Sequence, residues 1–240
     1  MDKDQIYSLP LRQVGDFAFD EQVVGVFPDM IKRSVPGYGS ILSMIGEVAE
    51  SYVRAETAVY DLGCSLGACT MVIRPRIPKD CVIHAVDSSE AMTRALQARL
   101  GELPPGCEVR LRCEDIRDTL IQNASLTVLN FTLQFVPREE REALLRQIAE
   151  GTLKGGALVL SEKICFDEPA HQELLTELHH SFKRANGYSE LEVAQKRTAL
   201  ENILIPESLD SHLARLKRVG FETACCWFQC FNFVSILAVK

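Results

Sequence analysis

Two acidic side chains in this sequence stand at the ends of short apolar runs, where they could accept hydrogen bonds from a bound nucleoside. Asp61 ends the first run, and after Leu62 comes a turn of mostly small residues, Gly63-Cys64-Ser65-Leu66-Gly67. Asp87 ends the second run, 82–86. In parallel α/β folds, glycines in such a turn let the backbone approach a ligand, and the acid after the second strand accepts from both ribose hydroxyls. The pattern predicts a nucleoside site.

The spacing within the turn separates two classes of nucleoside ligand. Dinucleotide sites carry G-x-G-x-x-G, whose backbone holds a pyrophosphate. Here the frame is Asp61-x-Gly63-x-Ser65-x-Gly67. A carboxylate in the turn would repel a pyrophosphate but can lie near the ammonium group of a methionine moiety. The pattern therefore favours S-adenosylmethionine (SAM), and the alternative is an ordinary strand–turn–helix junction capped by glycine.

The composition is typical of a globular protein and excludes several classes of partner. The 240 residues are 47% hydrophobic and 25% charged, with a net charge of −7. Proteins that grip a nucleic-acid backbone usually carry excess positive charge, so direct nucleic-acid binding is disfavoured. No apolar run approaches the roughly 20 residues that a membrane-spanning helix needs, and residues 1–5 begin no secretion signal. We therefore expect a cytoplasmic protein without membrane contact.

The nine cysteines follow neither a disulfide nor a metal pattern. Their number is odd, and no C-x-x-C pair occurs. The spacings Cys64-x4-Cys69 and Cys226-x3-Cys230 fit no common zinc site. Reduced thiols are expected, and no metal site is predicted.

Alternating strand and helix patterns predict an α/β fold with helices on both faces of a parallel sheet. The expected strands are 58–61, 82–87, 108–113, 126–130 and 157–161, with a turn at 154–156. The first expected helix begins near residue 67 and ends before Pro75. Three further helices are expected at 90–100, 138–150 and 208–219. The last two runs, 223–229 and 231–239, would close the sheet as an antiparallel hairpin. This is the Rossmann-like, seven-stranded class I methyltransferase fold.

Two helical segments lie outside the alternating pattern. Segments 20–32 and 38–52 have apolar residues at helical spacing, so residues 1–55 are expected to form a helical N-terminal extension over the nucleoside site. Residues 167–205 form an insertion with expected helices 170–183 and 190–202. The insertion carries seven basic or histidine residues: His171, His179, His180, Lys183, Arg184, Lys196 and Arg197. We expect one SAM-binding domain over residues 1–240, with the insertion forming part of the substrate pocket.

Five segments of the chain are similar to one family with this fold, the carboxy-S-adenosyl-L-methionine synthases. They are FPDMIKRSVPGY (27–38), DLGCSLGA (61–68), NFTLQF (130–135), FKRANGYSEL (182–191) and WFQCFNF (227–233). Many methyltransferases share the second segment, whereas the last two segments are far more specific. The resemblance runs from about residue 11 to residue 240.

The resemblance implies an enzyme that converts SAM and prephenate to carboxy-SAM and phenylpyruvate. Prephenate would lose its ring carboxylate and hydroxyl together, driven by aromatisation. A sulfonium ylide formed from the SAM methyl group would then capture the released carbon dioxide. The product would supply a partner enzyme that carboxymethylates hydroxyuridine at the wobble position of tRNAs. The resemblance also implies a homodimer.

Carried over position by position, the resemblance implies ten residues in contact with SAM or its product: Tyr38, Gly63, Cys64, Ser65, Asp87, Ser88, Asp115, Ile116, Asn130 and Arg197. Gly63, Cys64 and Ser65 would pass the methionine part, which Asn130 would also face. Asp87 would accept from the ribose, and Asp115 with Ile116 would frame the adenine. Tyr38 and Arg197, the catalytic residues implied, would approach the carboxylate added to the methyl group.

The residues themselves leave other interpretations open. Tyr38 could be a core tyrosine, Asn130 a turn residue, Asp115 a helix cap, and Arg197 a solvated cation beside Lys196. A small-molecule SAM-dependent methyltransferase would share every cofactor motif, and so would a non-catalytic SAM-binding module. A cationic pocket favours the carboxylating enzyme, because guanidinium groups pair with carboxylates whereas methyl transfer gives no reason for a cation beside a sulfonium.

Overall fold

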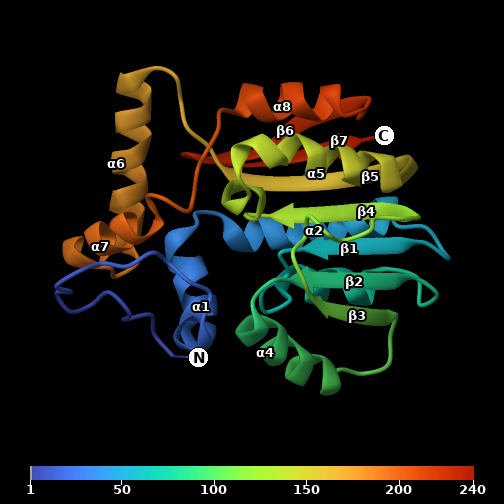
Figure 1. The fold of residues 1–240 in the computed structure, drawn as a ribbon, viewed down its shortest axis with the longest axis horizontal. Helices are drawn as coiled ribbons and strands as arrows, with labels where there is room; N and C mark the ends of the chain where they lie inside the picture. Colours follow the sequence, from blue (N-terminus) through green and yellow to red (C-terminus); the bar gives the residue numbers. More distant parts are fainter. Residues whose placement is uncertain (1) are drawn as a thin grey trace.

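The strands of the chain form one mixed sheet. The computed structural model describes residues 2–240, and its sheet has the order β3-β2-β1-β4-β5-β7-β6 (Figure 1). The strands are β1 (Ala58–Leu62), β2 (Val82–Asp87), β3 (Glu108–Cys113), β4 (Ala124–Asn130), β5 (Thr152–Lys163), β6 (Thr223–Cys230) and β7 (Phe233–Val239). The first five strands pair in parallel, and β7 runs antiparallel to both neighbours. The predicted fold class is confirmed.

Both faces of the sheet are buried because successive strand residues point to opposite sides. One core contains Leu158 and Leu160 of β5 with Leu145 of α5. The other contains Val159 of β5 with Ile45 of α2. The helices on the two faces are α2 (Tyr38–Tyr52), α3 (Ala68–Ile73), α4 (Glu90–Gly101), α5 (Arg138–Gly151) and α8 (Leu209–Arg218), and short 3-10 turns are η1 (Arg74–Arg76) and η2 (Leu133–Phe135).

Three more helices gather beyond the carboxyl ends of the parallel strands. They are α1 (Glu21–Ser34), α6 (Pro169–Ala185) and α7 (Glu190–Leu200), on the left of Figure 1. Asp20 caps α1 by accepting from the backbone nitrogens of Gln22 and Val23. The N-terminal extension and the insertion therefore meet, as α1 contacts α6 and α6 contacts α7. Among residues 2–240, no helix is both long and apolar enough to cross a bilayer.

The start of β5 differs from the prediction. The strand begins at Thr152, not at residue 157, and the expected turn at 154–156 lies within it. Thr152 pairs with Ala124 at the start of β4, ahead of an irregularity in that pairing. Gly155 has a φ of 73° and donates its N–H to the carbonyl of Lys240 at 2.6 Å. The strand therefore continues through the glycines, which bond to Lys240 where the pairing with β4 is irregular.

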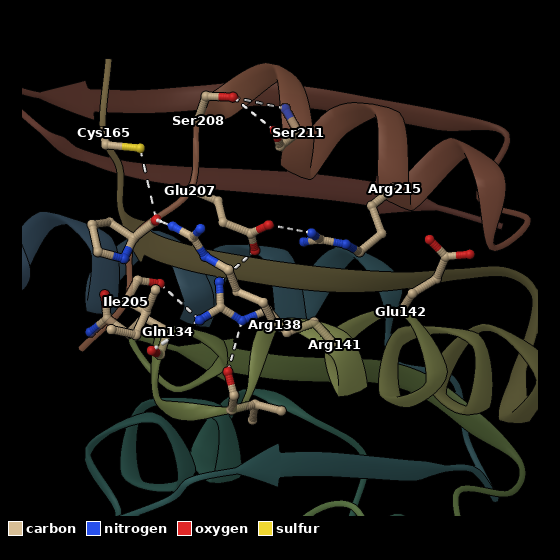
Figure 2. Close-up of polar contacts among 12 residues, drawn as sticks. Gln134, Arg138, Arg141, Glu142, Cys165, Ile205, Glu207, Ser208, Ser211 and Arg215 are labelled. Carbon is tan, nitrogen blue, oxygen red and sulfur yellow. Dashed lines mark hydrogen bonds and ion pairs between the residues drawn. The ribbon is translucent and has the colours of Figure 1, made fainter. Parts of the chain in front are cut away.

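A buried arginine fixes the point where the insertion returns to the sheet (Figure 2). Arg141 of α5 is fully buried and donates to the carbonyl oxygens of Ile205 at 2.8 Å and Gln134 at 3.2 Å. Its guanidinium also pairs with Glu207, which Arg215 of α8 contacts at 2.5 Å. The segment 205–207 is thus tied to the turn η2, which follows β4. This network holds one end of the insertion against the strand that carries Asn130.

Candidate active site

A cavity of about 490 Å³ lies at the carboxyl ends of β1, β2 and β4, a size typical of small-molecule sites. The helices α1, α6 and α7 form its opposite wall. Nine of the ten implied SAM-contact residues line it, and Arg197 does not: Tyr38, Gly63, Cys64, Ser65, Asp87, Ser88, Asp115, Ile116 and Asn130. The predicted nucleoside residues therefore come together in one cavity.

The turn after β1 requires glycine at position 63. Gly63 has a φ of 77°, and a Cβ there would lie 2.3 Å from Oγ1 of Thr132. The N–H groups of Gly63 and Cys64 both donate to the carbonyl of Val86, at 2.8 and 2.9 Å. These donors were expected to face the ligand, but they join the turn to the end of β2 because that carbonyl lies between them. These bonds hold the turn at the end of β2, and Gly63 lines the cavity without a side chain.

Asp87 is held by backbone donors from two directions. Its two carboxylate oxygens accept from the nitrogens of Ser65 at 2.8 Å and Ser89 at 2.9 Å. Burial raises the pKa of Asp87, and these two N–H groups act against that rise. Each oxygen keeps a lone pair for a further donor. This geometry suits the two hydroxyls of a ribose.

Acceptors gather where the methionine part of SAM would lie. Asp61 is buried and accepts from the N–H of Thr70 at 2.9 Å and its hydroxyl at 2.6 Å. Burial raises the pKa of Asp61 to about 6. The side-chain oxygen of Asn130 is buried and has no hydrogen-bond partner among the residues described. An ammonium group would give these oxygens the donors that they lack, so the residues present fit SAM.

The expected adenine end is partly open. Asp115 accepts from the side chain of Arg117 at 2.6 and 2.9 Å and from its N–H at 2.9 Å. The pKa of Asp115 is lowered, mainly by the hydrogen bonds from this guanidinium. No helix begins at Asp115 in the described chain, so the helix-cap alternative does not apply. Ile116 is buried beside it and offers an apolar surface.

Of the two implied catalytic residues, Tyr38 lines the cavity and Arg197 does not. Tyr38 is the first residue of α2, lines the cavity and lies 6.3 Å from Phe131 between ring centroids. Burial raises the pKa of its hydroxyl. Arg197 is exposed on α7, whose buried side chains include those of Gln195 and Lys196. The direct role of Arg197 therefore stays a prediction, and its neighbour Lys196 reaches the cavity instead.

The cavity lining includes four residues to which the sequence analysis gave no role of their own: Lys163, His179, Lys183 and Lys196. Lys163 ends β5, and the carboxyl end of a strand was a signal that could have identified it. The others belong to the basic insertion, but helical spacing alone did not show which residues face inward. Within residues 2–240, no group of three or more His, Cys, Asp or Glu residues is placed to hold a metal ion.

Comparisons with solved structures place the fold. A family model described as a methyltransferase domain matches residues 59–156. Magnesium protoporphyrin IX methyltransferase from Synechocystis, solved with bound SAM, aligns with a TM-score of 0.57 and 15% identity over 85% of this chain and 80% of its own. A SAM-dependent methyltransferase candidate from Methanococcus maripaludis aligns with a TM-score of 0.61 and 16% identity over 95% and 96%. These structures show the class I methyltransferase fold, and the cavity at its strand ends has residues that fit SAM.

Comparisons with sequences narrow this class to one family. Carboxy-S-adenosyl-L-methionine synthase from Geobacter sp. strain M21 is 55% identical over 99% of this chain and 98% of its own length. The synthase of the same name from Shewanella oneidensis is 54% identical over 99% and 98%. The chain belongs to the carboxy-S-adenosyl-L-methionine synthase family.

Proposed function

We propose that the chain converts SAM and prephenate to carboxy-SAM, phenylpyruvate and water. Prephenate loses its ring carboxylate as carbon dioxide and its hydroxyl as hydroxide, and its ring becomes aromatic. The SAM methyl group loses a proton and forms a carbon–carbon bond with the carbon dioxide. Hydroxide and the proton combine as water, so atoms and charge balance. The new carboxylate remains on the sulfur-bound carbon.

The observation that supports this proposal is that hydrogen-bond acceptors and cations line the same cavity. The ends of β1 and β2 supply the acceptors Asp61 and Asp87, and the helices α6 and α7 supply the cations Lys183 and Lys196. A sulfonium substrate alone would be repelled by such cations. An enzyme that also binds a carboxylate-bearing substrate gains from them. This supports carboxylation over the rival function, methyl transfer to a small molecule.

Tyr38 and Arg197 are proposed to act on the carboxylate side of the reaction. Tyr38 already lines the cavity, and its hydroxyl can donate a hydrogen bond to the new carboxylate. Arg197 lies close enough to Lys163 that its positive charge helps to lower the pKa of that lysine, after the larger effect of burial. Its guanidinium therefore stands at the edge of the same cationic region.

The product is proposed to be the carboxymethyl donor for wobble uridine modification of tRNA by a separate enzyme in the cytoplasm. The resemblance supports this step, and the net charge of −7 supports a chain that does not itself grip RNA. A homodimer is proposed as well. Leu174, Leu178 and Leu191 on α6 and α7 are exposed large apolar residues that a second copy could cover.

A product assay tests the proposed function. Purified protein incubated with SAM and prephenate is expected to yield phenylpyruvate and a nucleoside heavier than SAM by one carbon dioxide, in equal amounts. Mass spectrometry and the absorbance of the enol of phenylpyruvate measure the two products. S-adenosylhomocysteine as the only nucleoside product, formed with a methylated acceptor, would instead establish the rival methyltransferase.

A further inference from the structure

Three lysines from three separate elements converge on one wall of the cavity. Lys163 ends β5, Lys183 lies in the last turns of α6, and Lys196 lies in α7. Lys183 and Lys196 are only 7% and 6% exposed, and Lys163 is partly buried. All three line the cavity. Such burial of ammonium groups is rare in proteins unless an anion pairs with them.

Only one of these lysines has an anionic partner. The ammonium of Lys196 lies 3.5 Å from Asp4 and 3.2 Å from the hydroxyl of Ser34. Asp4 also accepts from the hydroxyl of Tyr188 at 2.5 Å, so its carboxylate is already engaged. The ammonium groups of Lys163 and Lys183 form no hydrogen bond or ion pair with any residue between 2 and 240. Two lysine side chains, one buried and one partly buried, therefore line the cavity without a protein counter-charge.

The groups around this pair make its positive charge costly unless an anion binds there. Burial first, and then the charges of Lys196 and Lys163, lower the pKa of Lys183 to about 7. His179 donates its Nε2–H to the carbonyl of Ser34 at 2.8 Å, which leaves Nδ1 as an acceptor. Burial and the two nearby lysines lower the pKa of His179 to about 2, so the ring is neutral. No side chain at this end of the cavity offers a spare negative charge among the described residues.

We infer that Lys163 and Lys183 form a carboxylate-binding subsite that selects a small dianion as the second substrate. The inference rests on the proposed function and extends it by naming the residues that recognise the second substrate. Each unpaired ammonium can donate hydrogen bonds to one carboxylate and form an ion pair with it. A substrate with two carboxylates satisfies both lysines, whereas a monoanion or a neutral acceptor leaves one of them buried and unpaired.

The subsite also suits the course of the reaction. Before the reaction, both negative charges belong to one molecule. Afterwards, one carboxylate remains on the keto acid and the other lies on the modified nucleoside. The total negative charge in the cavity is unchanged, so both lysines stay paired until a product leaves. Loss of the first product leaves one lysine without its partner, and the second lysine can still hold the remaining carboxylate.

Methionine substitutions test the subsite, because methionine keeps much of the length of lysine and removes its charge. We expect Lys163→Met and Lys183→Met each to raise the KM for prephenate at least tenfold. The Kd for SAM, measured by calorimetry, is expected to change less than threefold. Lys32→Met on the exposed side of α1 is the matched control and is expected to behave like the wild type.

Thermal unfolding separates a binding role from a structural one. Removal of an unpaired buried charge is expected to leave the Tm unchanged or to raise it in Lys183→Met. A lower Tm together with an unchanged KM for prephenate in both variants would overturn the inference while the proposed function stands. A wild-type protein that binds SAM but forms no carboxylated nucleoside from prephenate would instead overturn the proposed function. The two failures are therefore distinguishable.

Discussion

The carboxylate of Asp87 lies 2.8 Å from the backbone nitrogen of Ser65, so the end of β2 and the turn after β1 are held in one arrangement. The same carboxylate accepts from the nitrogen of Ser89 at 2.9 Å. One side chain thus positions the turn after β1 and keeps lone pairs free for a further donor. We expect the binding of SAM to depend on both roles, with the turn beside the methionine part and the lone pairs toward the ribose.

Replacement of Asp87 tests this coupling. Asp87→Ala removes the acceptor for two backbone donors and for the ribose hydroxyls, so we expect the Kd for SAM to rise about 100-fold, or about 3 kcal/mol. Isothermal calorimetry measures this change. Asp80→Ala removes the same charge at an exposed position and is the control. A change in Kd below threefold for Asp87→Ala would show that another group binds the ribose.

Gly63→Ala tests the need for glycine in the turn. The substitution places a Cβ 2.3 Å from Thr132 at a φ of 77°, so we expect the free energy of unfolding to fall by about 3 kcal/mol. Gly155→Ala is a matched control with a φ of 73° and no atom within 4 Å of the new Cβ. Gly155→Ala should lower the free energy of unfolding by only about 1 kcal/mol, because alanine is strained at a positive φ. Equal losses in urea unfolding would show that contact with Thr132 is unimportant.

Arg197→Ala tests the catalytic role implied by the resemblance. If Arg197 contacts the added carboxylate, its loss should weaken the binding of carboxy-SAM at least tenfold more than the binding of SAM, since a charged hydrogen bond contributes about 2 kcal/mol. Arg184→Ala, in an exposed position on α6, is the control. Calorimetry with both ligands gives the comparison. Equal weakening of the two ligands would assign the carboxylate to other cations.

Glu162 gives the stability of the protein a specific pH dependence. Its side chain is fully buried, with one oxygen accepting from the N–H of Leu133 at 3.0 Å and the other without a partner. Burial raises its pKa from 4.5 to about 8. The folded protein therefore keeps a proton that the unfolded chain releases, so the contribution of Glu162 to stability decreases as the pH rises from 4.5 to about 8.

Glu162→Gln should remove this part of the pH dependence, because glutamine still accepts from Leu133 and does not ionise. Relative to the wild type, the variant should gain stability steadily between about pH 5 and about pH 8. Urea unfolding across this range measures the difference. Glu150→Gln, at an exposed position of α5, is the control. A constant difference between Glu162→Gln and the wild type would mean that Glu162 is already ionised in the fold.

The strand ends could be predicted from the sequence because local signals mark them. The apolar run of β2 ends at Asp87 and the alternating charged and apolar pattern of β3 ends at Cys113, and the structure ends both strands there. The start of β5 depends on the pairing of Thr152 with Ala124, a contact between distant parts of the chain. The pair Gly155-Gly156 is compatible with a turn or with an irregular strand, so the local sequence does not decide between them.

The nucleoside half of the site was predictable for the same reason, since Gly63 and Asp87 belong to a local pattern. The positions of the lysines on the opposite wall of the cavity could not be predicted in this way. Lys196 and Arg197 are adjacent, and one residue turns a helix by about 100°, so their side chains leave α7 in different directions, and Lys196 is the one that lines the cavity. The choice depends on how α7 packs against the N-terminal segment, where Gln195 donates to the carbonyl of Tyr7 at 2.9 Å. That contact spans most of the chain.

The meeting of α1, α6 and α7 over the strand ends has an evolutionary consequence. The sheet and its turns handle the nucleoside with residues that the fold provides in common with methyltransferases. Most of the opposite wall, where we propose that the second substrate binds, comes from segments outside that alternating core, and β5 adds Lys163. A lineage can therefore acquire a new reaction by exchanging these outer helices, without disturbing the packing on which the core depends for folding.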